Sequence, residues 1–249
     1  MINIFRKARK NLVDKNNFIK YTKYAIGEIF LIVIGILLAL YLNHLYTERS
    51  IKAEQIKILE EIKSNLSSSI ISFERAIVSE KNYMAYNEMI LDHLDHHKPY
   101  DTVLDIAFGT YFWTISANAV TGAYDYLKSK GIDLITNDQL RKEISFLFES
   151  QLLIHKNENE VWANNLQQNI SYPFHVKHFR KYYPDQVASA DYEYARPFNY
   201  DLLLEDGYFK SINAEIISNR KWNINSLQKT IDQIRKLIED IDKELVLLN

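Results

Sequence analysis

The chain contains no cysteine and few of the residues that interrupt helices. The lack of cysteine excludes disulfide bonds, thiolate metal sites and cysteine nucleophiles, but it leaves the cellular compartment open. Only six glycines and four prolines occur in 249 residues, which favours long helices over a fold of many short strands. The composition therefore predicts an all-α protein.

Sequence motifs of common enzymes are also missing. The sequence has no Gly-rich phosphate loop, no GxSxG and no HExxH pattern, and its scattered glycines cannot form a phosphate cradle. We therefore expect a protein that is not an enzyme and needs no cofactor.

The net charge of -2 hides an asymmetry between the two ends of the chain. Residues 1–23 hold seven Lys or Arg and one Asp, a net charge of +6. Residues 47–249 hold 23 basic and 30 acidic side chains, a net charge of -7. Because an acidic domain repels nucleic acid, we expect no nucleic-acid partner.

One long apolar run lies near the N-terminus. From Ile29 to Leu42 every residue is apolar or glycine, and residues 24–46 are long enough to cross about 30 Å of hydrocarbon as a helix. A buried helix of a soluble protein is one alternative, but the run has no polar face to turn toward water. A cleavable signal peptide is the closer alternative, but it requires small residues at its end, and Ala39 is followed by two bulky residues. The sequence predicts a retained transmembrane helix in contact with the lipid bilayer.

The charges that flank the run predict its orientation. Lys and Arg are in excess before the span and are mixed with Glu after it, so residues 1–23 should be cytosolic and residues 47–249 should form a domain on the far side. Residues 1–23 also have apolar side chains every three or four positions between basic ones, as in a helix on an anionic membrane surface. The positive charge that normally flanks the cytosolic end of a transmembrane helix explains this segment equally well. The apolar positions are Ile2, Phe5, Ala8 and Leu12.

Two features of the span could serve more than anchoring. Glu28 is its one acidic residue, and intramembrane carboxylates are functional candidates because burying their charge is costly. Its position about one turn inside the cytosolic boundary favours a carboxylate that reaches the headgroups. Gly27, Leu31, Gly35 and Ala39 form a stripe of mostly small residues on which a second helix could pack.

Two segments carry a family resemblance. Residues 20–43, KYTKYAIGEIFLIVIGILLALYLN, resemble the anchor of an uncharacterised single-span membrane-protein family common in Bacteroidota. Residues 126–141, YLKSKGIDLITNDQLR, are similar to the middle segment of that family. The resemblance implies an inner-membrane protein with one anchor, followed by helices that face a diderm periplasm. It implies no activity and no catalytic residues.

Apolar periodicity predicts a helical bundle after the anchor, formed by a long first helix, helices within 101–171 and a C-terminal helix. Gly131 suits a helix C-cap, and Thr136 with Gln139 forms a capping-box pattern at the start of the next helix. The stripe on the first helix is Leu59, Ile62, Leu66, Ile70, Phe73, Ile77, Met84 and Leu91. The C-terminal helix carries a 3-4 repeat at Ile224, Leu227, Ile231, Ile234, Ile238, Ile241, Leu245 and Leu248. Because the positions beside this repeat lack a complementary charge code, we favour packing within the chain over a self-associating coiled coil.

Residues 172–209 differ in composition, with three of the four prolines and eleven Tyr or Phe. We predict a long aromatic and proline-rich loop with short helical turns. Its aromatics either pack over one end of the bundle or form a surface for a protein partner or a second copy of the chain. The candidates for such a surface are Tyr182, Tyr183, Tyr192, Tyr194, Phe198 and Tyr200.

One cluster has the chemistry of metal ligands. Asp92 and His93 lie one helical turn from His96 and His97, so two imidazoles and a carboxylate could meet a divalent metal. The alternative is a solvated helix end before Pro99, where His is favoured by the helix dipole. Three functions remain: a non-enzymatic periplasmic module that binds a partner protein or ligand, a metal-binding envelope enzyme, and a sensor. About 23 residues before the span are too few for a folded output domain, which weakens the sensor.

Overall fold

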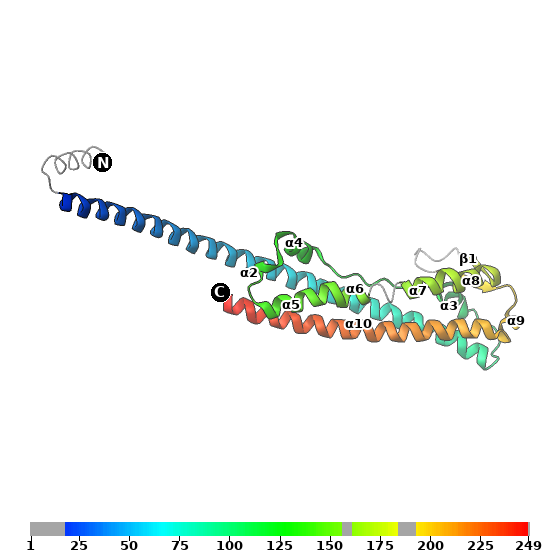
Figure 1. Ribbon diagram of the computed structural model, residues 1–249. Helices are drawn as coiled ribbons and strands as arrows, with labels where there is room; N and C mark the ends of the chain where they lie inside the picture. Colours follow the sequence, from blue (N-terminus) through cyan, green and yellow to red (C-terminus); the bar gives the residue numbers. More distant parts are fainter. Residues whose placement is uncertain (1–17, 156–160, 184–192, 249) are drawn as a thin grey trace. The chain divides into compact units, whose positions relative to one another are not determined.

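The computed structural model describes residues 18–155, 161–183 and 193–248, and these are mostly helical (Figure 1). The chain divides into two compact units, Met1–Gln55 and Ile56–Asn249. The described elements are α2 (Phe18–Asp95), α3 (Leu104–Thr110), α4 (Gly122–Lys130), η1 (Ile132–Leu134), α5 (Asp138–Phe146), η2 (Leu147–Gln151), α6 (Leu152–His155), α7 (Val161–Leu166), η4 (Gln167–Ser171), α8 (Tyr172–His178), β1 (Phe179–Tyr182), β2 (Tyr194–Pro197), α9 (Tyr200–Leu204) and α10 (Gly207–Leu248). Of these, η1 is a 3-10 helix, and η2 and η4 are π-helical turns.

The first unit contains the apolar run as part of α2. No residue in the most apolar window of this helix is buried, and the exposed side chains include Phe30, Leu31 and Leu40. In the part of the chain that the structure describes, this is the one helix long and apolar enough to cross a membrane. The prediction of one such helix near the N-terminus is confirmed. Predictions for residues 1–17, including the amphipathic surface helix, lie outside the described residues.

In the second unit, α10 packs antiparallel to the later part of α2. Their contacts run in opposite directions along the two helices: Lys63 pairs with Asp242, Glu74 with Arg235 and Glu80 with Arg220. The 3-4 repeat of α10 forms the apolar part of this interface, with Leu227, Ile231, Ile234 and Ile241 at most 1% exposed. Packing of this repeat within the chain is therefore confirmed.

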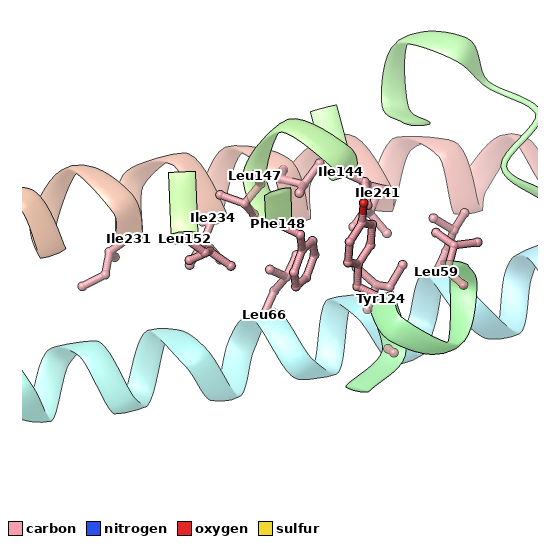
Figure 2. Packing of buried hydrophobic residues seen from close by; sticks show 14 of the residues in the cluster. Leu59, Leu66, Tyr124, Ile144, Leu147, Phe148, Leu152, Ile231, Ile234 and Ile241 are labelled. Carbon is pink, nitrogen blue, oxygen red and sulfur yellow. The ribbon is translucent and has the colours of Figure 1, made fainter. Parts of the chain in front are cut away.

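A first apolar cluster lies where α4, α5 and η2 cover the pair of long helices (Figure 2). Leu59 and Leu66 from α2 meet Ile234 and Ile241 from α10, and the ring of Phe148 stacks on that of Tyr124 at a centroid distance of 4.5 Å. The predicted stripe on α2 is its inner face, because each of its eight residues is buried or half-buried.

A second apolar cluster is aromatic and surrounds the end of α2. It joins Ile90 and Leu94 to side chains from α3, α8, β1, β2, α9 and the start of α10. Burial of large aromatic side chains supplies much of the free energy that holds such short elements together. Its aromatic members are Phe108, Tyr111, Phe112, Phe174, Phe179 and Phe209.

Three local predictions are corrected. The described residues within 172–209 are not a loop with helical turns alone, because β1 and β2 pair antiparallel with Phe179 opposite Pro197 and Tyr182 opposite Tyr194. Asn137, not Thr136, caps α5, since its side chain accepts hydrogen bonds from the backbone amides of residues 139 and 140. The helical segment that was expected to end near Ser171 continues as α8 to His178. Gly131 ends α4 with φ at 106°, as predicted.

Candidate functional site

The histidine cluster lies at the end of α2, where each imidazole has a different partner. The His93 Nδ1 atom is 3.0 Å from the backbone oxygen of Met89. His96 Nδ1 is 3.1 Å from a carboxylate oxygen of Asp92, and His97 Nδ1 is 3.4 Å from a carboxylate oxygen of Glu205. The backbone of His97 adopts a positive φ of 47°, which turns the chain out of the helix.

Asp92 is also engaged outside the histidines. It accepts a hydrogen bond from the Lys98 ammonium, and this bond lowers the pKa of the Asp92 carboxyl. Among the described residues, no group of three or more His, Asp or Glu side chains is arranged around a common point. The structure therefore does not bring Asp92, His93, His96 and His97 together as ligands, and metal binding there stays a prediction.

The predicted aromatic surface divides into exposed and anchored side chains. Tyr183 and Phe198 are exposed at 76% and 67%. Tyr182, Tyr194 and Tyr200 are half-buried and pack within the second unit. Tyr192 lies outside the described residues. The exposed set extends to residues that the sequence did not indicate, Leu202 at 70% and Tyr208 at 58%. We call Phe198, Leu202 and Tyr208 the aromatic end of the domain.

Asp105, in the first turn of α3, anchors the hairpin that leads to this surface. Its side chain is almost completely buried and accepts hydrogen bonds from the hydroxyls of Tyr100 and Tyr182. The Arg196 Nε donates to the same carboxylate over 3.0 Å, and the guanidinium lies 4.4 Å from the centre of the Tyr182 ring. A buried carboxylate is stable when it is both paired and hydrogen-bonded, as this one is. One carboxylate thus connects α3 to both strands.

The pKa values of the side chains that surround Asp105 reflect the same arrangement. Burial raises the pKa of Tyr100 and Tyr182, and their hydrogen bonds to the Asp105 carboxylate raise it further. The hydrogen bond to Asp105 also raises the pKa of Arg196. Both phenols are therefore neutral donors and Arg196 is a cation at physiological pH, so the network keeps one protonation state.

A glycine permits close contact between α3 and the chain that enters β2. A Cβ atom on Gly109 would lie 1.8 Å from the backbone oxygen of Glu193. No side chain fits in that space. The close approach holds Glu193 against α3, so the hairpin is held at this point as well as at Asp105.

A layer of polar side chains separates the two apolar clusters. The Arg220 Nη1 donates to Glu80 over 2.5 Å, and Arg220 also donates to the side chain of Asn87 and to the backbone oxygen of Trp113. Asn223 donates to the second oxygen of Glu80, and the side chains of Asn87 and Asn213 pair with each other. All five side chains are at most 6% exposed. A cavity of about 30 Å³, large enough for about one water, lies beside Arg220.

Sequence reasoning missed this layer, although the signal was present. The 3-4 repeat of α10 continues backward from Ile224 through Arg220, Ile217 and Asn213. On α2, Glu80 and Asn87 each follow an apolar stripe position by three residues. Polar residues at core positions of both helices predict a buried polar contact. No sequence pattern predicts the pairing of Asp105 with Arg196, because the two residues are 91 positions apart.

The candidate residues of the apolar helix belong to the first unit and take part in none of the contacts described above. Gly27, Gly35 and Ala39 are exposed, and open space surrounds a Cβ atom added to either glycine. Glu28 is half-buried and has an electrostatic or hydrogen-bonding partner. Packing of a second helix on this stripe stays a prediction.

Comparison of the chain with protein-family models, with curated proteins and with solved structures finds no match.

Proposed function

We propose that this chain is a single-span membrane protein whose C-terminal domain binds a partner protein through its aromatic end. The exposed apolar stretch of α2 supports the anchor, because a helix without a polar face is stable only when lipid covers it. The excess of Lys and Arg in residues 1–23 supports a cytosolic N-terminus. The resemblance of residues 20–43 and 126–141 to a Bacteroidota family supports a periplasmic location for the domain, on the inner membrane.

The observation that carries the interaction is the exposure of Phe198 and Leu202 on an anchored backbone. The backbone amide of Phe198 donates to the oxygen of His178 over 2.9 Å, which extends the pairing of the hairpin by one residue. Asn199 then caps α9 by accepting from the amide of Leu202 over 3.2 Å. Two large apolar side chains are therefore held in defined positions instead of collapsing into the core.

A preorganised apolar surface favours binding, because little conformational entropy is lost when a partner covers it. The remaining aromatics of the segment support this role by packing beneath the surface. Tyr200 donates to the backbone oxygen of Lys98 over 3.1 Å, and Phe174 lies against both Tyr208 and Phe209. The proposal therefore combines the two interpretations of the aromatic segment. Some rings pack into the core of the domain, and others are exposed for a partner.

In-cell photocrosslinking tests this proposal. A photoreactive amino acid is placed at Phe198 or at Leu202, and the crosslinked products are identified by mass spectrometry. Val78 on α2 is the control, since it is also an exposed apolar residue, at 58%. We expect one envelope protein to be captured from both test positions and not from Val78.

Two outcomes would contradict the proposal. Equal capture from Val78 would mean that the crosslinks report general proximity. Capture of the chain itself and of nothing else would assign the aromatic end to a homo-oligomer.

A further inference from the structure

A groove separate from the aromatic end lies between α7 and α10. Its volume is about 350 Å³, which is within the roughly 300–1,000 Å³ of small-molecule sites. One wall is Trp162 of α7. The other wall is a row on one face of α10, spaced by three or four residues so that its side chains share that face. The row is Glu215, Ser218, Asn219 and Trp222.

The two indoles of the groove are unusually exposed for tryptophan. Trp162 and Trp222 keep 43% and 46% of their surface accessible, although neither belongs to the two apolar clusters. Burial of a large aromatic side chain is favourable, so two half-exposed indoles leave part of that free energy unrealised. A ligand that covers both rings would recover this free energy.

The groove has the electrostatic character of a cation site. Glu215 is exposed and forms no ion pair with any described residue, so it adds a negative charge to the groove. No Lys, Arg or His is among the five residues that line the groove. The faces of the indole rings carry negative potential as well. The net charge of -7 on residues 47–249 adds a long-range attraction for cations.

We propose that this groove binds a small quaternary-ammonium compound. A trimethylammonium group carries a positive charge on an apolar surface, so it can contact aromatic faces at a small desolvation cost. Trp162 and Trp222 supply the faces, Glu215 supplies the opposite charge, and Ser218 or Asn219 can accept a hydrogen bond from a hydroxyl on the ligand. This site is independent of the partner surface, because it shares no residue with Phe198, Leu202 and Tyr208.

Calorimetric titration of the full chain with choline chloride tests the proposal. The protein is kept in a maltoside detergent, since phosphocholine detergents and lipids carry the same cation and would compete. We expect saturable binding of choline and none of its neutral isostere, in which a tert-butyl group replaces the trimethylammonium. Sodium chloride at the same ionic strength should not reproduce the heat.

Variants assign the binding to the groove. Trp162→Ala and Trp222→Ala should each weaken binding by about 2- to 30-fold, the range expected for one cation–π contact. Glu215→Gln should also weaken it. Glu239→Gln removes the same charge from another exposed position of α10 and should leave binding unchanged. Near-UV circular dichroism of each variant shows whether the fold is intact.

Three results would overturn the proposal. These are no saturable binding of choline, equal binding of the neutral isostere, or a loss with Glu239→Gln as large as that with Glu215→Gln. Each leaves the photocrosslinking result at Phe198 unaffected, so failure here is distinguishable from failure of the proposed function.

Discussion

Asp105 shows how one side chain can position an exposed surface, the proposed partner site, that it does not touch. It lies in α3, yet its carboxylate holds Tyr182 of β1 and Arg196 of β2. The exposed Phe198 follows two residues after Arg196, so the orientation of the hairpin determines where that ring is presented.

Replacing Asp105 by Asn should loosen the hairpin. The substitution keeps the shape of the side chain but removes the charge that pairs with Arg196. Asn has one acceptor oxygen instead of two, so it can accept fewer of the hydrogen bonds that Tyr100, Tyr182 and Arg196 donate. We expect the free energy of unfolding to fall by about 2 kcal/mol, as for hydrogen bonds to a charged group. Urea denaturation of the full chain in detergent measures this change. Asp133→Asn, at an exposed carboxylate with one 3.6 Å ion pair, should change stability by less than about 0.5 kcal/mol, and an equal loss would contradict the assignment.

His175 is a buried histidine, and neither of its ring nitrogens has a hydrogen-bonding partner among the residues that the structure describes. Its ring stacks on Phe179 at 5.1 Å and lies 4.7 Å from Phe112. Burial, with a smaller contribution from the Lys181 charge, lowers the pKa of His175 from 6.5 to about 4. The imidazole is therefore an apolar packing group in the folded protein.

Stability should depend on pH through this residue. The folded pKa is lower than the unfolded one, so the unfolded state binds more protons between pH 6.5 and about 4. Its contribution is fully present above pH 6.5 and is lost as the pH falls toward 4, by up to about 3 kcal/mol. Urea midpoints of the wild type and of His175→Phe and His175→Leu, measured across this range, provide the test. A pH slope that is the same in all three proteins would rule out His175 as its source.

At the scale of elements, α2 and α10 form the frame of the domain, and their polar layer explains how their register is set. Two apolar faces with a regular 3-4 spacing could pack after a shift of one repeat with little loss of burial. A shift would bury Glu80 and Arg220 without partners, which is strongly unfavourable. The apolar faces thus supply the stability, and the polar layer supplies the alignment.

Removing one partner of the buried pair should cost more than removing both. Arg220→Met leaves the Glu80 carboxylate buried and unpaired, and we expect a loss of about 3–5 kcal/mol in the free energy of unfolding. The double variant Glu80→Met with Arg220→Met should recover much of that loss. Chemical denaturation of both single variants and the double variant gives the coupling between the two side chains. Additive losses in the double variant would show that the pair is not coupled.

At the scale of the whole molecule, the chain combines an apolar helix long enough to cross a membrane with a domain that has its own core. The distribution of charge follows the same division, with +6 in residues 1–23 and -7 in residues 47–249. The proposed topology follows from these two facts, because Lys and Arg are retained on the cytosolic side during insertion.

Protease added to intact spheroplasts tests that topology. We expect the C-terminal domain to be digested while a cytosolic marker protein in the same cells stays protected. A tag on the N-terminus should survive on a fragment that is extracted only with detergent. Full protection of the domain until the cells are lysed would reverse the proposed orientation.

The sequence by itself determined the features that depend on neighbouring residues. Helical content, the apolar run and the 3-4 repeat of α10 follow from composition and from periodicity, which are local properties. The inner face of α2 from Leu59 to Leu91 was predictable for the same reason. The start of α5 was displaced by one residue because Thr136 and Asn137 can both cap a helix.

Only the tertiary structure decided which side chains meet across long separations. The Asp105 network joins residues up to 91 positions apart, and the Glu80–Arg220 pair joins residues 140 apart. The hairpin was missed because its strands are four residues each and depend on long-range contacts with α3, at Asp105 and Gly109. Which rings of the aromatic segment are buried and which are exposed was likewise undetermined, since Phe179 and Phe198 have the same chemistry and differ only in what packs against them.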